Sequence, residues 1–188
     1  MLKNVWQFNH EPREGCWETG NGAYVIRTDK ISRTVEFARN TLTQRTVLPG
    51  CTAEVTVNTE GLRAGDVTGL CLLIGSYGLI GVERNEEGYS LVMKARKSHE
   101  QEEREYARIP WKTREVRLRA AVRFAGPEGR VCFEYLDSSG WKPLGPEHTM
   151  AFALDHFTGC RFGLFLYSAR ESGGQAAFSR FTYRPADQ

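Results

Sequence analysis

The acidic residues of this chain are the first candidates for chemistry, because glycoside hydrolysis requires two carboxyl groups about 5–9.5 Å apart. Glu54, Glu83 and Glu134 each stand alone in a segment with strand-like alternation, and the pattern E-x-D-x-x-E of one group of sandwich glycanases is absent. The outward faces of antiparallel sheets are normally polar, so isolated glutamates are typical of solvated strand faces, although two of them could meet across a sheet. A complete hydrolytic site is therefore not expected in this chain.

Other catalytic patterns are also missing. The four histidines lack the HExxH and HxH spacings of a metal pair, and the chain contains no GxSxG, GxxxxGK[ST] or helix-opening GxGxxG motif. Hydride transfer and phosphoryl transfer therefore have no support, and no cofactor is expected.

The five cysteines form no CxxC pair, and their odd number leaves at least one unpaired within the chain. Cys51, Cys71, Cys132 and Cys160 lie in or beside apolar runs, which predicts small buried hydrophobic residues and no zinc site. Lectin-like sandwiches often hold a structural calcium, for which Asp66 and Asp155 are the nearest candidates, but no ligand cluster is visible.

Aromatic and amide side chains offer a different chemistry, because a flat ring suits the apolar face of a pyranose. Trp141 follows a DSSG turn and is a candidate for sugar stacking or for core packing, whereas core packing is favoured for Trp6. Gln44, Arg45 and Asn58 are candidate hydrogen-bonding partners of a sugar.

The charges of the chain exclude some classes of partner. Its 188 residues carry 25 basic and 23 acidic side chains, so that the net charge of +2 gives no reason to expect nucleic acid or an anionic membrane. No run approaches the ~18 apolar residues of a membrane span, and the first residues have no apolar stretch of the signal-peptide type. We expect a cytoplasmic protein, or alternatively a piece of a longer one.

Alternation of polar and apolar residues predicts many short strands. It is clearest at 53–60, 115–124 and 129–137, and the segments 67–75 and 160–168 are apolar on both faces, as expected for central strands. Further strands are predicted at 23–28, 42–46, 77–84, 89–96 and 176–184. Segment 98–107 is predicted to be a helix or a solvated loop. This pattern predicts an all-β, two-sheet antiparallel sandwich of the jelly-roll type, formed by one domain over 1–188 with its core at about 5–184.

Three stretches resemble a known family: WQFNHEP at 6–12, ARNTLTQRT at 38–46, and the closing run from DHFTGCRFGLFLYS at 155–168 to AAFSRFTY at 176–183. Together they resemble the C-terminal concanavalin A-like sandwich of family 43 glycoside hydrolases of the β-xylosidase type. The N-T-L-T-Q-R run is the most specific piece, and the likeness extends from about Trp6 to Tyr183.

The resemblance implies that catalysis belongs to a five-bladed β-propeller, in the same polypeptide or in a partner, on which the sandwich packs. It also implies that the loop 155–159 lends an aromatic residue to the substrate pocket. By position this residue is Phe157, flanked by Asp155 and His156.

Three functions follow as hypotheses. The first is an accessory domain of a xylan-degrading enzyme, either a β-xylosidase or an arabinofuranosidase. The second is a free-standing carbohydrate-binding module for plant-wall polysaccharide, with xylo-oligosaccharide or a related glycan as its ligand. The third is an independent sandwich glycosidase.

Overall fold

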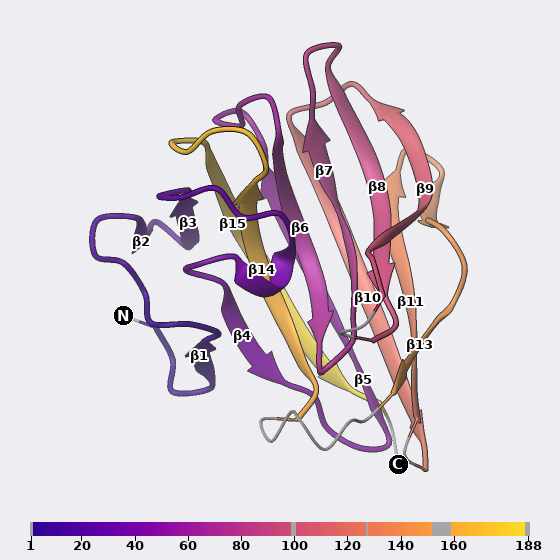
Figure 1. Cartoon of the computed structure of the whole chain (residues 1–188). Helices are drawn as coiled ribbons and strands as arrows, with labels where there is room; N and C mark the ends of the chain where they lie inside the picture. Colours follow the sequence, from indigo (N-terminus) through magenta and orange to yellow (C-terminus); the bar gives the residue numbers. More distant parts are fainter. Residues whose placement is uncertain (1, 99–100, 127, 152–158, 187–188) are drawn as a thin grey trace.

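Two antiparallel sheets make up almost all of the ordered elements (Figure 1). The computed structural model describes residues 2–98, 101–126, 128–151 and 159–186. Sheet A contains, in spatial order, β1 (Trp6–Phe8), β4 (Leu42–Arg45), β14 (Arg161–Ser168), β6 (Asp66–Leu73), β7 (Tyr77–Arg84), β8 (Tyr89–Arg96) and β9 (Arg104–Trp111). Sheet B contains β12 (Gly140–Pro143), β11 (Glu128–Asp137), β10 (Glu115–Ala125), β5 (Gly50–Asn58), β15 (Gln175–Pro185), β3 (Ala23–Arg27) and β2 (Trp17–Gly20), with β13 (His148–Ala151) paired to β11. The predicted two-sheet sandwich is confirmed.

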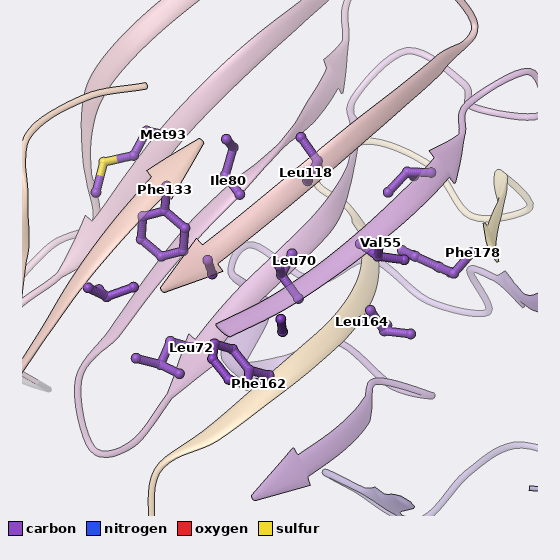
Figure 2. Packing of buried hydrophobic residues seen from close by; sticks show 14 of the residues in the cluster. Val55, Leu70, Leu72, Ile80, Met93, Leu118, Phe133, Phe162, Leu164 and Phe178 are labelled. Carbon is purple, nitrogen blue, oxygen red and sulfur yellow. The ribbon is translucent and has the colours of Figure 1, made fainter. Parts of the chain in front are cut away.

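The main core lies between the two sheets and follows from the alternation in the sequence. Along β10 the apolar residues Val116 and Leu118 are buried, while Arg117 and Arg119 between them face outward. Figure 2 shows side chains from the two sheets meeting between the ribbons, among them Leu118 of sheet B and Leu70 of sheet A. These contacts hold the sheets face to face.

A second apolar cluster covers the outward face of sheet A and explains why β6 and β14 are apolar on both sides. The segment around the 3₁₀ helix η1 (Val35–Phe37) crosses this face and buries Val35 and Ala38 against it. The strands contribute Val67, Cys71, Leu73, Tyr77, Leu79, Val92, Phe165 and Tyr167 to the same cluster. Sheet A is thus packed on both faces over its centre.

The segment 98–107 differs from its prediction, because Arg104 begins strand β9 at the edge of sheet A. Its charged side chains are those of an edge strand whose outward face meets solvent, and Arg108 there pairs with Glu105 at 2.7 Å. The short strands β1, β2, β12 and β13 were also not predicted. They have three or four residues each, too few to display a period.

The cysteines are all free thiols, and Cys51, Cys71 and Cys160 are buried as predicted. The prediction for Cys132 is wrong, because this residue is exposed. Its neighbours Val131 and Phe133 on β11 point into the core, so alternation places Cys132 on the outward face. The described part of the chain has no helix with the length and hydrophobicity needed to cross a membrane.

Candidate functional site

Two of the three candidate glutamates lie in one row across the outward face of sheet B. Arg119 stands between them, paired in register with Glu54 on β5 and with Glu134 on β11. Arg119 Nε donates a hydrogen bond to Glu134 Oε2 at 2.7 Å, and Arg117 Nη2 donates to Glu54 Oε2 at 2.6 Å. Both carboxylates thus accept charge-assisted hydrogen bonds from arginines of β10. This row is therefore an ion-pair network.

Glu83 lies on the other sheet, on the outward face of β7. Its two oxygens accept hydrogen bonds from Lys94 Nζ at 2.6 Å and from Arg108 Nη2 at 2.7 Å. Burial raises the pKa of Glu83, but the hydrogen bonds from Lys94 and Arg108 outweigh it, so the net pKa lies below the ordinary value. Glu83 is thus separated from Glu54 and Glu134 by the thickness of the sandwich.

Sequence reasoning missed a fourth carboxylate, Glu103, which lines the same pocket of about 270 Å³ as Glu83. Burial raises the pKa of Glu103, and Tyr77 Oη donates a hydrogen bond to its Oε2 at 2.9 Å. Opposite pKa shifts on two carboxyl groups are typical of acid–base sites. Here, however, both oxygens of Glu83 are bound by cations, and the pocket is smaller than the roughly 300–1,000 Å³ of most ligand sites. The contacts therefore indicate a structural cluster that anchors the loop before β9.

Trp141 on β12 lies beside the ion-pair row of sheet B. The Arg119 guanidinium carbon is 4.1 Å from the centroid of the indole ring, and that of Arg117 is 5.8 Å away. This is cation–π geometry. A sugar that stacks on this face of Trp141 must first displace Arg119, and a sugar contact of Trp141 stays a prediction.

The three predicted hydrogen-bonding partners of a sugar do not come together. Gln44 is half-buried and lines a cleft with Trp6, its cross-strand neighbour. Arg45 is exposed at the end of β4, and alternation points it to the opposite face of the sheet. Asn58 ends β5, where its Oδ1 accepts a hydrogen bond from the Glu60 backbone N–H at 3.0 Å. Of this group, only Gln44 lies in a cleft that could hold a ligand.

The predicted pocket residues Asp155, His156 and Phe157 lie outside the described residues. The connection that flanks them is described. Cys160 O, just before β14, accepts hydrogen bonds from Thr46 N and from Thr46 Oγ1, each at 3.0 Å. This ties the approach to β14 to the connection between β4 and β5, where Val47 is 42% exposed and Leu48 is 74% exposed.

The calcium candidates do not form a cluster in the described part of the chain. Asp66 is fully buried, and its Oδ2 accepts a hydrogen bond from the Arg63 backbone N–H at 2.7 Å, so its carboxyl group holds a turn. Asp155 lies outside the described residues. Within residues 2–98, 101–126, 128–151 and 159–186, no three His, Cys, Asp or Glu side chains are placed to share a metal ion. A structural calcium stays a prediction.

His148 is a titratable residue of the interior whose position the sequence did not indicate. It is 4% exposed, and its Nε2 has no hydrogen-bond partner among the described residues. A methyl group added at Gly78 would stand 2.9 Å from the Phe133 ring and 3.3 Å from the His148 ring, which shows how closely these residues pack. Burial and the charge of Lys97 lower the pKa of His148. The histidine is therefore held neutral, as a packing residue.

A protein-family model described as the β-xylosidase C-terminal concanavalin A-like domain matches residues 1–184. The chain belongs to this family. It is 26% identical over 207 residues to a β-xylosidase of Formosa agariphila. The match covers 95% of this chain and 32% of that protein. The resemblance to family 43 enzymes is thereby confirmed.

Solved structures agree with this assignment of the concanavalin A-like domain. A bifunctional GH43-CE protein of Bacteroides eggerthii matches with a TM-score of 0.91 and 32% identity, over 100% of this chain and 24% of that one. A GH43 glycoside hydrolase engineered to display both endo-xylanase and exo-arabinofuranosidase activity matches with a TM-score of 0.90 and 25% identity, over 99% of this chain and 39% of that one. The domain thus spans only a minor part of each of these three proteins.

Proposed function

We propose that this chain is a non-catalytic accessory domain of a family 43 glycoside hydrolase that acts on xylan-type substrates as a β-xylosidase or an arabinofuranosidase. The observation that carries the proposal is that the domain covers 24%, 32% and 39% of three relatives while its own candidate glutamates are bound by arginine and lysine. Larger proteins with the same domain have room for a separate catalytic unit, and in this domain each of the three candidate glutamates is held by a basic side chain.

In this proposal the sandwich packs on a catalytic β-propeller, in the same polypeptide or in a partner. The exposed side chains of Val47 and Leu48 support docking through the end of the sandwich that holds the β4–β5 connection. The hydrogen bonds from Thr46 to Cys160 link that end to the segment leading out of the loop 155–159. Docking there brings Phe157 to the mouth of the propeller's substrate pocket.

Docking is tested by measuring the association of this domain with a separately expressed family 43 catalytic propeller. Leu48→Ser weakens the association of the separately expressed domains at least about fivefold, because it removes an apolar contact from the interface. Ile31→Ser is the matched control, since Ile31 is 56% exposed and belongs to the segment that crosses sheet A. Equal association of both variants contradicts docking at this end.

The pocket role is tested on a protein in which this domain is fused to that propeller. Phe157→Ala raises the KM for 4-nitrophenyl β-D-xylopyranoside, because an aromatic wall of the pocket is lost. Tyr106→Ala, at an exposed position on the edge strand β9, leaves the KM unchanged. Unaltered kinetics in Phe157→Ala contradict the pocket role without affecting the proposal of a docked accessory domain.

A further inference from the structure

A cleft opens at one edge of the sandwich, between the edge strand β1 and its neighbour β4 in sheet A and the strands β2, β3 and β15 of sheet B. Strands β1, β2, β3 and β4 lie on the left of Figure 1. The cleft has a volume of about 820 Å³, which lies in the range of ligand-binding sites. By comparison, the two smaller pockets on the faces of the sandwich measure about 400 and 270 Å³.

Aromatic rings line the cleft above an apolar floor. Leu42, Leu164 and Phe178 form part of that floor and are almost completely buried. The rings of Trp6 and Phe181 meet with centroids 4.7 Å apart at an angle of 59°, and both line the cleft. A half-buried ring of this kind offers the flat apolar surface on which the C–H face of a pyranose stacks.

A bulge in β15 creates this arrangement. The pairing of β15 with β5 shifts between Ser179 and Thr182, and Arg180 has a left-handed backbone with φ of 51°. Left-handed conformations are costly for residues other than glycine, and those that persist cluster at functional sites. The bulge brings Phe181 against Trp6 while Arg180 remains on the cleft lining.

Several polar groups of the cleft have no partner in the part of the chain that the structure describes. Among the described residues, no hydrogen bond or ion pair involves the Gln44 amide, the Lys3 ammonium or the Arg180 guanidinium. All three residues line the cleft, where no aspartate or glutamate of the described chain lies, and Arg180 also lines the pocket of about 400 Å³ that contains Glu115 and Asp137. The lining of the cleft therefore includes two basic residues, the Gln44 amide without a hydrogen-bond partner among the described residues, and the rings of Trp6 and Phe181. This contrasts with Trp141, whose ring carries the Arg119 guanidinium.

We infer that this edge cleft binds an acidic saccharide, a pyranose that carries a carboxylate as in a uronic acid. The Trp6 and Phe181 rings contact the apolar face of the sugar, and Gln44 exchanges hydrogen bonds with its hydroxyls. Arg180 and Lys3 bind the carboxylate, for which the planar guanidinium provides two parallel N–H donors. The inference goes beyond the proposed function, because the cleft belongs to this chain alone and needs no catalytic domain to bind.

The test is isothermal titration calorimetry of the 188-residue chain with two matched ligands, a xylo-oligosaccharide that bears one glucuronosyl group and the same oligosaccharide without it. The acidic ligand binds with a Kd in the millimolar range or tighter, at least about tenfold more tightly than the neutral one, and the difference shrinks as salt is added. Free glucuronate serves as a third ligand and separates carboxylate binding from recognition of the whole saccharide.

Variants assign the binding to the cleft. Arg180→Ala lowers the affinity for the acidic ligand about tenfold or more and leaves that for the neutral ligand unchanged, because only the charged contact is lost. Gln44→Ala weakens the binding of both ligands. Arg184→Ala is the matched control, because Arg184 is an exposed arginine on the same strand that does not line the cleft. Circular dichroism confirms that each variant is folded.

Three outcomes overturn the inference. They are an absence of heat with either oligosaccharide at millimolar concentration, equal affinity for the two, and an effect of Arg184→Ala as large as that of Arg180→Ala.

Discussion

Phe165 lies at the centre of the cluster on the outward face of sheet A, and its truncation tests how that face is held. Phe165 on β14 is paired in register with Gly69 on β6, which is paired with Gly81 on β7. A methyl group built on Gly81 would stand 3.4 Å from Phe165 Cζ, and one on Gly69 would meet the backbone of Ile80 and Gly81. Gly81 thus leaves room beside the phenyl ring, and Phe165 is 0% exposed.

Phe165→Ala is expected to lower the free energy of unfolding by about 3–5 kcal/mol, the range for removing a buried phenyl ring. The upper part of that range applies, because the two glycines have no side chains that could move into the space. For a domain of this size 1 kcal/mol changes Tm by roughly 2–4 °C, so a loss of about 4–5 kcal/mol should lower the melting temperature by roughly 8–20 °C.

The measurement is urea and thermal unfolding followed by circular dichroism. Phe37→Ala is the matched control, since Phe37 is 56% exposed in the segment that crosses the same face, and its loss is expected to stay within about 0.5–1 kcal/mol. A loss below about 1 kcal/mol for Phe165→Ala, or equal losses in the two variants, would refute the view that the ring holds this face together.

Two further predictions concern charge. Burial and Lys97 lower the pKa of His148, so the unfolded chain binds protons more readily than the folded one, and stability falls as the pH drops below the ordinary value of 6.5. Between about pH 8 and about pH 5 the midpoint of urea unfolding of the wild-type chain should therefore fall relative to that of His148→Leu. Arg119→Ala, which removes the partner of Glu134 and the cation over Trp141, should cost roughly 1–2 kcal/mol in urea unfolding.

Each of these predictions has an internal control. Burial raises the pKa of Asp66 and Glu103, which gives a pH dependence of the opposite sign, so only the difference between the wild-type chain and His148→Leu reports on the histidine. Parallel pH curves would contradict a buried neutral His148. Arg130→Ala is the control for Arg119→Ala, because Arg130 is 62% exposed and lies 3.6 Å from Glu147. If Arg130→Ala lowers the free energy of unfolding as much as Arg119→Ala does, the ion-pair row across sheet B contributes no more to stability than an exposed ion pair.

The long strands could be predicted from the sequence because each has one face on the core or both faces covered. In β7 and β8 the predicted bounds, 77–84 and 89–96, agree with the structure. Strand β9 could not be predicted, because its first residues are charged and only its pairing with β8 reveals it as a strand. Periodicity reports which side chains share a face, and it does not report which strands are neighbours.

The candidate site was less accessible to sequence reasoning for the same reason. That Arg119 would stand between Glu54 and Glu134 depends on the register of three strands, which the sequence does not specify. The edge cleft joins Trp6, Gln44 and Arg180 from positions far apart in the chain, and the bulge at Arg180 has no distinct pattern in the sequence. Gln44 was found by its residue type alone, and Trp6 was expected to be a core residue.

Hydrolysis of 4-nitrophenyl β-D-xylopyranoside by the isolated chain tests the central claim most directly, since an accessory domain without an acid–base pair should give no turnover above the uncatalysed rate. The assay includes Glu54→Gln, Glu83→Gln, Glu103→Gln and Glu134→Gln, which remove the four carboxylates considered above. The predicted result is that the wild-type chain gives no turnover and that activity appears when a family 43 catalytic propeller is joined to it. Turnover by the isolated chain that one of these substitutions abolishes would contradict the account.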